Sequence, residues 1–227
     1  MGLTIIIPAA GEGSRFAKEG FTDPKPFIKA NGVPMIDLVS QMFSDIADRI
    51  VVICQKQHAQ RFIDAGYPDL VILDKKNEGA ALSVLCAEGV IPDDEEVAIC
   101  NVDNLFDWDL EPFFAKAKKY EGAILTFPVE SGPWSYVLAN RFDKVLRVRE
   151  KEQISKLATA GLYYFREWRL LRNAVCKMIS EEDRHNGEFY LAPCYNYVAG
   201  DVISIEMPTD AFISLGTPEA LEAYHAR

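Results

Sequence analysis

The sequence predicts an α/β protein built on a doubly wound, mostly parallel sheet, with a small antiparallel extension. Four short apolar runs rich in β-branched residues occupy residues 5–7, 50–54, 70–73 and 97–100. Amphipathic stretches of helical length separate them, at residues 35–47, 57–65 and 79–88. Strands that alternate with such helices form right-handed βαβ units, whose parallel strands are covered on both faces.

The second half of the chain has a different pattern. Strand-like runs with short connections follow one another at residues 123–129, 136–140, 145–148 and 159–165. They predict an antiparallel or mixed extension of the sheet. Helices are expected at residues 167–180 and 189–198, and a late strand at 202–206. A final helix should start with Thr217 as N-cap and Pro218 as first residue. No repeat or linker interrupts the 227 residues, so we expect a single domain over residues 1–227.

Composition excludes several classes of protein. The net charge of −10 disfavours non-specific nucleic-acid binding, which needs a basic face. No run of eighteen apolar residues predicts a membrane span, and no signal peptide is recognisable. The five cysteines are widely spaced, which predicts buried thiols of a cytoplasmic protein. The three histidines fit no triad or metal spacing, so a hydrolase is disfavoured.

A glycine loop follows the first strand in the stretch "IIIPAAGEGSRF". Gly11 and Gly13 allow backbone N–H groups to form an anion-binding nest and let a phosphate approach the main chain. A dinucleotide fingerprint would need a glycine at Phe16, and the Gly-Lys-Ser/Thr of a Walker A loop is absent. A long loop with glycines at the end of a first strand is usually functional, the alternative being an ordinary surface loop.

Two cations of this loop are suited to phosphate. Arg15 offers a planar fork for bidentate contact with phosphate oxygens. Lys25 lies between Pro24 and Pro26, which should confine its backbone to extended conformations and aim its ammonium group.

Asn101 and Asp103 follow the apolar strand in "EVAICNVDN". Ligands of open α/β sheets bind at the carboxyl ends of the strands, and Mg²⁺ prefers one or two carboxylates together with phosphate oxygens and water. Asp103 is therefore a candidate metal ligand. The alternative is a turn-forming aspartate ahead of "LFDWDL".

These motifs together resemble the nucleotidyltransferases that activate sugar phosphates. "PAAGEGSRF" with "DPKPF" is similar to the G-x-G-x-R…P-K signature of that family, and "NEGAALSVL", "CNVDNLFDWD", "PWSYV", "REKEQISKLATAGLYYF", "NGEFYLAPCYN" and "SLGTPEAL" follow in the corresponding order. The likeness is greatest to the compact branch for capsule or surface-polysaccharide synthesis, which includes cytidylyltransferases. It implies a Rossmann-like sheet of the GT-A/nucleotidyltransferase type, with a nucleotide-binding half at 1–121 and an acceptor-binding half at 122–227.

The resemblance also implies residue roles in the nucleotide half. Catalysis falls on Arg15 and Lys25, which neutralise the leaving pyrophosphate and the reacting phosphates. Mg²⁺ falls on Asp103, with Ser214 where the family often has a second ligand. Nucleotide contacts fall on Ala9, Ala10, Gly11, Gly13, Ser14, Glu78, Gly79, Ala80 and Asn101. The small residues from Gly79 also suit close packing of a helix on a sheet. The base implied is a pyrimidine, cytosine first.

On the acceptor side, the resemblance places Glu150 on the hydroxyls of the acceptor and Lys151 on its phosphate. A solvated charge run is the alternative. Further candidates for this pocket are Trp134, Tyr136, Thr159, Gly161 and Glu188. A tryptophan is more often simply part of the core.

The leading hypothesis is thus a Mg²⁺-dependent nucleotidylyltransferase of the EC 2.7.7 type. It would join an NTP, CTP first, to a sugar phosphate or another small phosphorylated acceptor, with homo-oligomerisation left open. Two alternatives remain: a GT-A glycosyltransferase that uses a nucleotide sugar, and a non-catalytic nucleotide-binding regulator.

Overall fold

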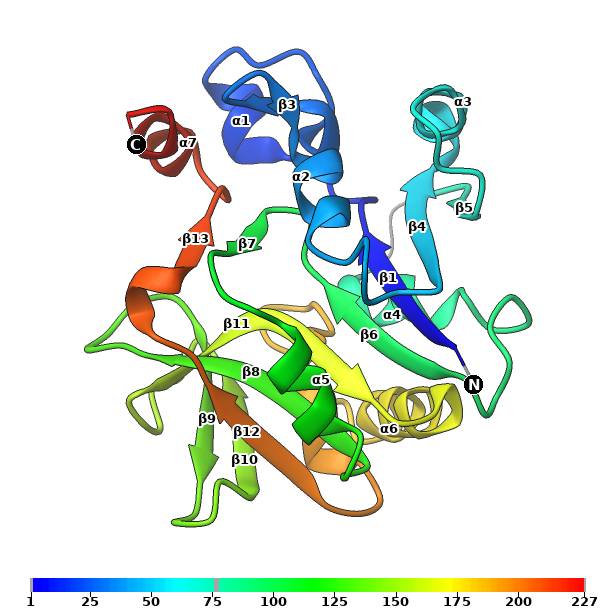
Figure 1. Cartoon of the computed structure of the whole chain (residues 1–227). Coiled ribbons are helices and arrows are strands. Elements are labelled where there is room, and N and C mark those ends of the chain that lie inside the picture. The colour runs from blue at the N-terminus through cyan, green and yellow to red at the C-terminus, as the bar shows by residue number, and fades with distance from the viewer. Residues whose placement is uncertain (1, 76–77, 227) are drawn as a thin grey trace.

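The four apolar runs of the first half form the parallel part of one central sheet (Figure 1). In the computed structural model, which describes residues 2–75 and 78–226, these strands lie in the order β5, β4, β1, β6 and are mutually parallel. Their bounds are β1 Leu3–Pro8, β4 Arg49–Gln55, β5 Leu70–Leu73 and β6 Glu96–Cys100. The strand order reverses between β1 and β6, and such a reversal opens a crevice at the carboxyl ends of the strands.

The second half adds the predicted extension to the same sheet. β11 is antiparallel to β6 and to β8, and β9 and β10 continue the sheet beyond β11. β12 pairs in parallel with β8, so the sheet is mixed. The bounds are β8 Gly122–Pro128, β9 Ser135–Ala139, β10 Val145–Glu150, β11 Leu157–Phe165 and β12 Val202–Glu206.

Helices cover both faces of the sheet and bury two separate apolar clusters. One cluster receives side chains from α2, α3 and α5, and the other from α4 and α6. Ile5 and Ile7 of β1 face the first cluster, whereas Ile6 faces the second. A strand buried on both faces reads as a continuous apolar run, which explains "TIII". The bounds are α2 Met35–Gln41, α3 Ala59–Asp64, α4 Ala80–Leu85, α5 Glu111–Ala117 and α6 Trp168–Ser180.

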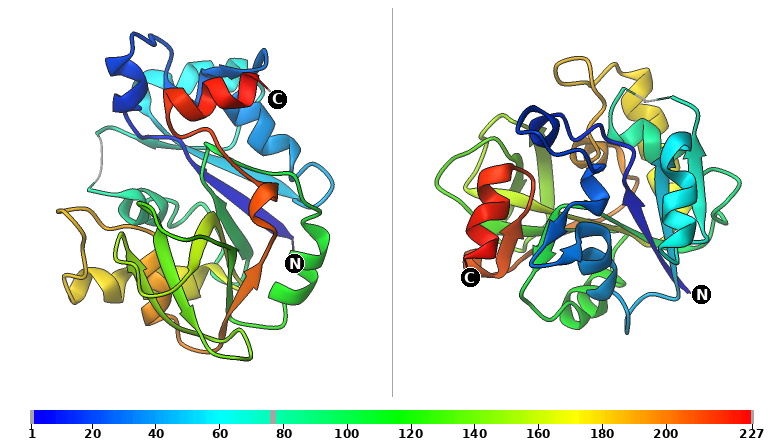
Figure 2. Two further views of the ribbon diagram at one scale, coloured as in Figure 1. Left: turned by 90° about the vertical axis from the view of Figure 1, so that its left-hand side faces the viewer. Right: turned by 90° about the horizontal axis from the view of Figure 1, so that it is seen from above.

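Short elements close the molecule around the end of β1. They are α1 Ser14–Lys18, β2 Lys29–Ala30, β3 Val33–Pro34, β7 Asn104–Phe106, β13 Phe212–Ser214 and α7 Pro218–His225. β13 pairs with β7, so Ser214 lies opposite Asn104. Figure 2 shows α7 beside the segment that contains β2 and β3, and Asn31 donates a hydrogen bond to the Tyr224 carbonyl at 3.4 Å. Thr217 caps α7 as predicted, accepting a bond from the Ala220 N–H at 3.2 Å.

Two predicted helices differ in the structure. Residues 189–198 form only a 3₁₀ segment, Ala192–Tyr197, because its side chains bond outside it. The Tyr195 hydroxyl donates toward the Ala123 and Tyr164 carbonyls, and the Asn196 amide pairs with both backbone groups of Val148. The helix predicted over residues 35–47 ends at Gln41 and continues as tighter turns.

The expected burial of the cysteines holds for three of the five. Cys54, Cys100 and Cys194 are buried, but Cys86, which follows α4, and Cys176 of α6 are exposed. Over residues 2–75 and 78–226, no helix is long and apolar enough to cross a bilayer.

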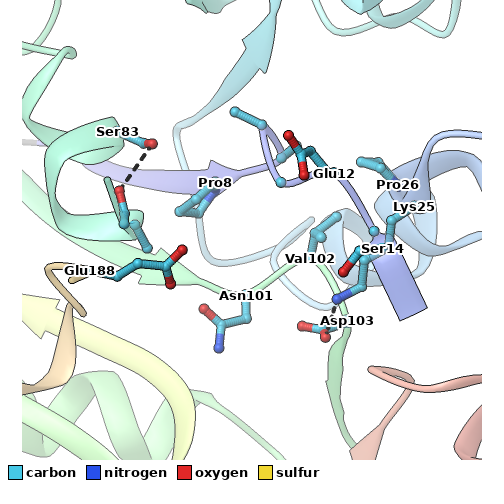
Figure 3. Close-up of a pocket in the computed structure, with 16 residues that line it drawn as sticks. Pro8, Glu12, Ser14, Lys25, Pro26, Ser83, Asn101, Val102, Asp103 and Glu188 are labelled. Atoms are coloured by element: carbon cyan, nitrogen blue, oxygen red, sulfur yellow. Dashed lines mark hydrogen bonds and ion pairs between the residues drawn. The ribbon is translucent and has the colours of Figure 1, made fainter. Parts of the chain in front are cut away.

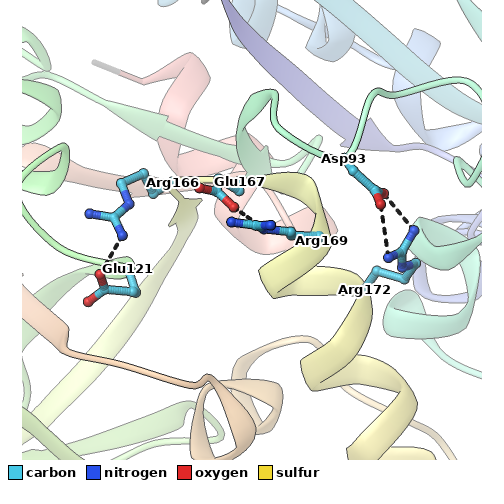
Figure 4. A network of polar contacts seen from close by, with 6 residues as sticks. All are labelled: Asp93, Glu121, Arg166, Glu167, Arg169 and Arg172. Carbon is cyan, nitrogen blue, oxygen red and sulfur yellow. Dashed lines mark hydrogen bonds and ion pairs between the residues drawn. The ribbon is translucent and has the colours of Figure 1, made fainter.

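The start of α6 is fixed by ion pairs at the surface (Figure 4). Arg172 makes a bidentate contact with Asp93 at 2.5 and 3.1 Å, and Arg166 pairs with Glu121 at 2.5 Å. Exposed pairs of this kind contribute up to about 1 kcal/mol each to stability. In these pairs each guanidinium donates at least one short hydrogen bond to a carboxylate.

Candidate active site

The glycine loop leaves β1 and is tied to the neighbouring strand β4. The Ala9 N–H donates to the Ile53 carbonyl at 2.8 Å, and the Gln55 side chain donates to the Ala10 carbonyl at 2.7 Å. Gly13 has φ +61°, a conformation that favours glycine. A Cβ at Gly13 would lie 3.0 Å from the Cβ of Lys25, so this glycine also allows the lysine to pack against the loop.

Lys25 does not have the extended backbone that its flanking prolines predict. It starts the 3₁₀ turn Lys25–Phe27, which closes through the bond from the Phe27 N–H to the Pro24 carbonyl at 2.8 Å. Pro26 and Phe27 are buried, and we infer that this burial overrides the preference of a residue before proline for extended conformations. The turn directs the ammonium group of Lys25 toward the end of β6.

Lys25 and Asp103 form a direct ion pair. Lys25 Nζ lies 2.5 Å from Asp103 Oδ2, and the two side chains are 21% and 18% exposed. The residues are 78 positions apart in the chain, and the loop after β1 meets the turn after β6 at this point. A charge-assisted bond that is partly screened from water holds the two groups in place relative to each other.

Asp103 belongs to a turn held by backbone bonds from two directions. The Asn101 N–H donates to the Gly161 carbonyl at 3.0 Å, and the Leu215 N–H donates to the Asp103 carbonyl at 2.7 Å. Gly161 has φ +82°, and a Cβ there would lie 2.5 Å from the Asn101 amide nitrogen. Glycine is therefore required for the close approach of β11 to this turn.

These segments enclose a cavity of about 330 Å³ (Figure 3). Most of the residues predicted to bind nucleotide line it, together with Lys25 and the candidate metal ligand: Ala9, Ala10, Gly11, Gly13, Ser14, Lys25, Gly79, Ala80, Asn101 and Asp103. Residues that the sequence analysis did not single out also line it: Pro8, Glu12, Pro26, Ser83 and Val102. Each is a sequence neighbour of a predicted residue or lies one helical turn from it. This adjacency is the feature of the sequence from which these lining residues could have been predicted.

Glu188 lines this same cavity rather than one on the acceptor side. Its carboxylate points inward opposite Asn101 in Figure 3. The next residue, Phe189, bonds through its backbone to the Glu78 carbonyl at 2.8 Å and to the Ala81 N–H at 3.1 Å. Gly79 has φ +114°, and a Cβ there would lie 2.3 Å from the Phe189 carbonyl oxygen. The absence of a side chain at Gly79 is what brings Glu188 to the cavity.

Two predicted residues lie outside the cavity lining. Arg15 is exposed on the short helix α1. Glu78 has a side chain that is 70% exposed and lies 3.5 Å from Arg184. Its neighbour in the motif, Asn77, falls outside the described residues.

Apart from Glu188 and from Gly161, which contacts Asn101, the acceptor-side candidates lie in the core or at a second cavity. Trp134 packs edge-on against Phe127 and Phe212, with centroids 5.5 and 5.8 Å away, so it has core contacts. Tyr136 is 1% exposed and donates to the Gly132 carbonyl at 2.8 Å. Thr159 is buried beside the Tyr163 hydroxyl at 3.0 Å.

Glu150 lines the second cavity, of about 200 Å³. Burial raises the pKa of its carboxyl, whereas the Ser135 hydroxyl, Lys151 and His185 act in the opposite direction. Lys151 Nζ lies 4.0 Å from Glu150 Oε1 and donates to the Tyr190 hydroxyl at 2.8 Å. The predicted pair is thus adjacent, with each partner bonded to a third group.

The donor set at Asp103 suits a magnesium ion that is shared with substrate. Within residues 2–75 and 78–226, no group of three or more His, Cys, Asp and Glu side chains is placed to hold a metal. Mg²⁺ needs no such cage, since one carboxylate with phosphate oxygens and water suffices. Ser214 is near, because Asp103 Oδ2 and Ser214 Oγ both lie within 3.4 Å of the position a Cβ on Gly216 would take.

Comparison with known proteins identifies the family. The model of the MobA-like NTP transferase domain matches residues 5–172, about three quarters of the chain. The chain belongs to the MobA-like NTP transferase family. It is therefore a nucleotidyltransferase by family. The cavity lies at the carboxyl ends of β1 and β6, where the strand order of this NTP transferase fold reverses.

Curated relatives of this family member are longer proteins. The bifunctional protein GlmU of Methanocaldococcus jannaschii is 28% identical over 166 residues, which are 70% of this chain and 39% of that protein. GlmU of Methanococcus maripaludis strain C5 is 26% identical over 165 residues, with the same coverage. The chain thus matches about two fifths of the length of these relatives.

Solved structures of similar fold cover nearly the whole chain. A nucleoside-diphosphate-sugar pyrophosphorylase from Vibrio cholerae RC9 superposes with a TM-score of 0.83 at 22% identity, covering 98% of this chain and 100% of its own. A Bacillus anthracis protein provisionally assigned as a glucose-1-phosphate thymidylyltransferase, crystallised with a sucrose, gives 0.79 at 19% identity, covering 99% and 94%. HddC from Yersinia pseudotuberculosis, complexed with GMP-PN, gives 0.73 at 17% identity, covering 100% and 99%. They confirm the predicted Rossmann-like nucleotidyltransferase fold.

Proposed function

We propose that this NTP transferase joins a nucleoside triphosphate, CTP first, to a sugar phosphate or another small phosphorylated acceptor. The observation that carries the proposal is the convergence of the glycine loop, Lys25 and Asp103 on one cavity. The names of the relatives, which include GlmU and a sugar pyrophosphorylase, support an acceptor of the sugar-phosphate type. We assign nucleotide binding mainly to residues 1–121 and acceptor binding mainly to 122–227, with Glu188 as an exception.

The reaction needs no protein nucleophile. An oxygen of the acceptor phosphate forms a bond to the α-phosphorus of the triphosphate. The bond from that phosphorus to the bridging oxygen breaks, and pyrophosphate leaves with the electron pair. Because a phosphate monoester is largely a dianion near neutral pH, no general base is required. Catalysis then consists of positioning and charge neutralisation.

Lys25 is the group we assign to charge neutralisation. Its ammonium lies at the cavity wall beside Asp103, so it can turn from the carboxylate to phosphate oxygens without leaving the site. Asp103 is the residue that would hold Mg²⁺, with Asn101 and Ser214 as neighbours. When bound, Mg²⁺ supplies positive charge and fixes the geometry of the phosphates. Arg15 is assigned to the leaving pyrophosphate, from its exposed position next to the loop.

Cytosine is proposed as the base, and surface-polysaccharide synthesis as the setting. Both rest on the similarity of the motifs to the compact branch of sugar-phosphate nucleotidyltransferases. Neither the backbone-lined cavity nor the names of the relatives selects one base, since these names include a thymidylyltransferase and a complex with GMP-PN.

A pyrophosphate-release assay tests the proposal. The protein is incubated with each of the four common NTPs, Mg²⁺ and a panel of hexose, polyol and amino-acid phosphates. Pyrophosphate release with CTP and one acceptor is expected. Release only with another NTP would overturn the assignment of the base. No release with any pair, together with transfer from a nucleotide sugar, would identify a glycosyltransferase instead.

A further inference from the structure

The second cavity is lined by ionisable side chains of both signs. It lies between the end of β10 and the turn that follows α6, and its ionisable members include Arg149, Glu150, Glu152, Asp183, Arg184 and His185. A pocket for a neutral sugar ring needs hydrogen-bond donors and acceptors but few full charges. Burying charged groups of either sign costs free energy unless a ligand or a neighbouring group pairs with them.

Arg149 is incompletely paired in this cavity. Its Nε atom is buried and has no hydrogen-bond partner among residues 2–75 and 78–226. The carboxylates of Glu152 and Asp183 lie 3.8 and 3.9 Å away, beyond hydrogen-bond distance. Arg172, by contrast, makes two short bonds to one carboxylate at the start of α6 (Figure 4). The Arg149 side chain is 31% exposed, so a ligand carboxylate would meet its exposed atoms and not the buried Nε.

Glu150, the next residue in the chain, provides a carboxyl group to the same cavity. The residue is 8% exposed, and one of its oxygens accepts a bond from the Ser135 hydroxyl. The ammonium of Lys151 stands 4.0 Å from the other oxygen and bonds to Tyr190 instead. Glu150 is therefore placed to accept a hydrogen bond from a ligand ammonium.

One segment of the chain, residues 185–190, contributes to both cavities. His185 and Glu188 bond to each other through their backbones at 3.0 Å, forming a turn. Glu188 lines the first cavity, whereas His185 and Tyr190 line the second. Glu188 and Tyr190 are two residues apart, so their Cα atoms are at most about 7 Å apart. Residues 185–190 are therefore the segment past which an acceptor would have to reach from the first cavity to place its other end in the second.

We propose that the second cavity binds the far end of a zwitterionic acceptor, a phosphorylated molecule with both a carboxylate and an ammonium group, as in a phosphorylated α-amino acid. Arg149 binds the carboxylate and Glu150 the ammonium. This inference rests on the proposed function and names the class of its acceptor. It predicts that acceptor selection depends on both charges at the end remote from the phosphate.

Four phosphomonoesters of similar size test the charges separately. O-phospho-L-serine carries both groups, phosphoethanolamine only the ammonium, 3-phosphoglycerate only the carboxylate, and glycerol 3-phosphate neither. Binding is measured by calorimetry without and with CTP, and transfer by pyrophosphate release. O-phospho-L-serine should bind best, and loss of either charge should weaken binding about tenfold to hundredfold, as expected for a hydrogen bond to a charged group. Equal or tighter binding of glycerol 3-phosphate, or no binding of any of the four, would overturn the inference.

Variants then assign the charges to residues. Arg149→Gln should remove the advantage of O-phospho-L-serine over phosphoethanolamine, and Glu150→Gln its advantage over 3-phosphoglycerate. Arg141→Gln, at an arginine that lies over the Phe142 ring outside both cavities, is the matched control and should keep the order of binding. An unchanged order in Arg149→Gln would contradict the role of Arg149. Turnover of hexose phosphates but not of O-phospho-L-serine would overturn this inference and leave the proposed function standing, whereas absence of turnover with every pair would contradict the proposed function.

Discussion

The two cavities are built from different materials. Half of the residues that line the first cavity are glycine, alanine or proline, and the Lys25–Asp103 pair lies at one end. The second is lined mainly by long ionisable side chains from two distant segments, residues 149–152 and 183–190. A backbone-lined cavity suits a ligand part that is common to many substrates, such as a triphosphate. A cavity lined by side chains can differ between relatives while the fold stays the same.

The largest expected effect is the loss of turnover when Lys25 or Asp103, the charged pair of the first cavity, is replaced. Lys25→Ala should lower turnover by at least about 10²-fold to 10³-fold, the loss typical of removing one group that stabilises developing charge. Asp103→Ala should have an effect of the same order. Both are measured as pyrophosphate release at saturating NTP, and circular dichroism checks that the variants are folded.

Lys56→Ala is the matched control for the lysine. Lys56 also pairs with an aspartate, Asp74 at 3.1 Å, but the two side chains are 73% and 83% exposed. Its turnover should stay within about twofold, since exposed pairs contribute little. Pyrophosphate release by Lys25→Ala at the wild-type rate would contradict the role of Lys25 in catalysis. It would also contradict the proposed difference in function between the two cavities.

The next effect tests whether backbone approach, rather than side-chain chemistry, shapes the first cavity. Gly79→Ala should lower the free energy of unfolding by about 2–4 kcal/mol, because the new Cβ would lie 2.3 Å from the Phe189 carbonyl and φ is +114°. The control Gly89→Ala also has positive φ, at +79°, but nothing within 4 Å of its Cβ. It should cost about 1 kcal/mol. Equal midpoints in urea unfolding would show that the contact with Phe189 is unimportant.

The difference in material also explains what the sequence could predict. The parallel strands and the glycine loop follow from local patterns, since apolar runs and glycine restrict the backbone directly. Lys25 and Asp103 could each be recognised as candidates, yet their 2.5 Å contact depends on a tertiary meeting of segments 78 residues apart.

Glu188 and Arg149 mark the limit of sequence reasoning. Glu188 reaches the first cavity because Gly79 lets the backbone of Phe189 pack against the start of α4. In the sequence, Arg149 is one residue of a charge run. Its incomplete pairing is recognised only in the structure, where Asp183 lies 3.9 Å away and Nε makes no hydrogen bond with the described residues. No local periodicity encodes either arrangement.

A smaller effect concerns Asp103, which we propose as the ligand of Mg²⁺ in the first cavity. Ser214→Asp would add a carboxylate beside Asp103, since both side chains approach the same point near Gly216. We expect the Mg²⁺ concentration for half-maximal activity to fall a few-fold, because carboxylates are better ligands for Mg²⁺ than a hydroxyl. Ser44→Asp, which makes the same charge change in an exposed turn, is the control. An equal shift in both variants would indicate a general charge effect.

The smallest effect sharpens the contrast through the pH dependence of stability. Burial raises the pKa of Glu150 above its ordinary value of 4.5, so the folded state holds this proton more tightly than the unfolded chain. As pH rises above about 4.5, the unfolded chain releases its proton first, and the folded state loses stability until the folded pKa is passed. The difference in unfolding free energy between wild type and Glu150→Gln should therefore decrease with pH in that window and be flat below it. Ser135→Ala should steepen the decrease, because the Ser135 hydroxyl holds this pKa down. A difference that rises with pH would mean that the folded protein stabilises Glu150 as a carboxylate. The residues of the second cavity would then already balance the charge of Glu150, in contrast to the incomplete pairing of Arg149.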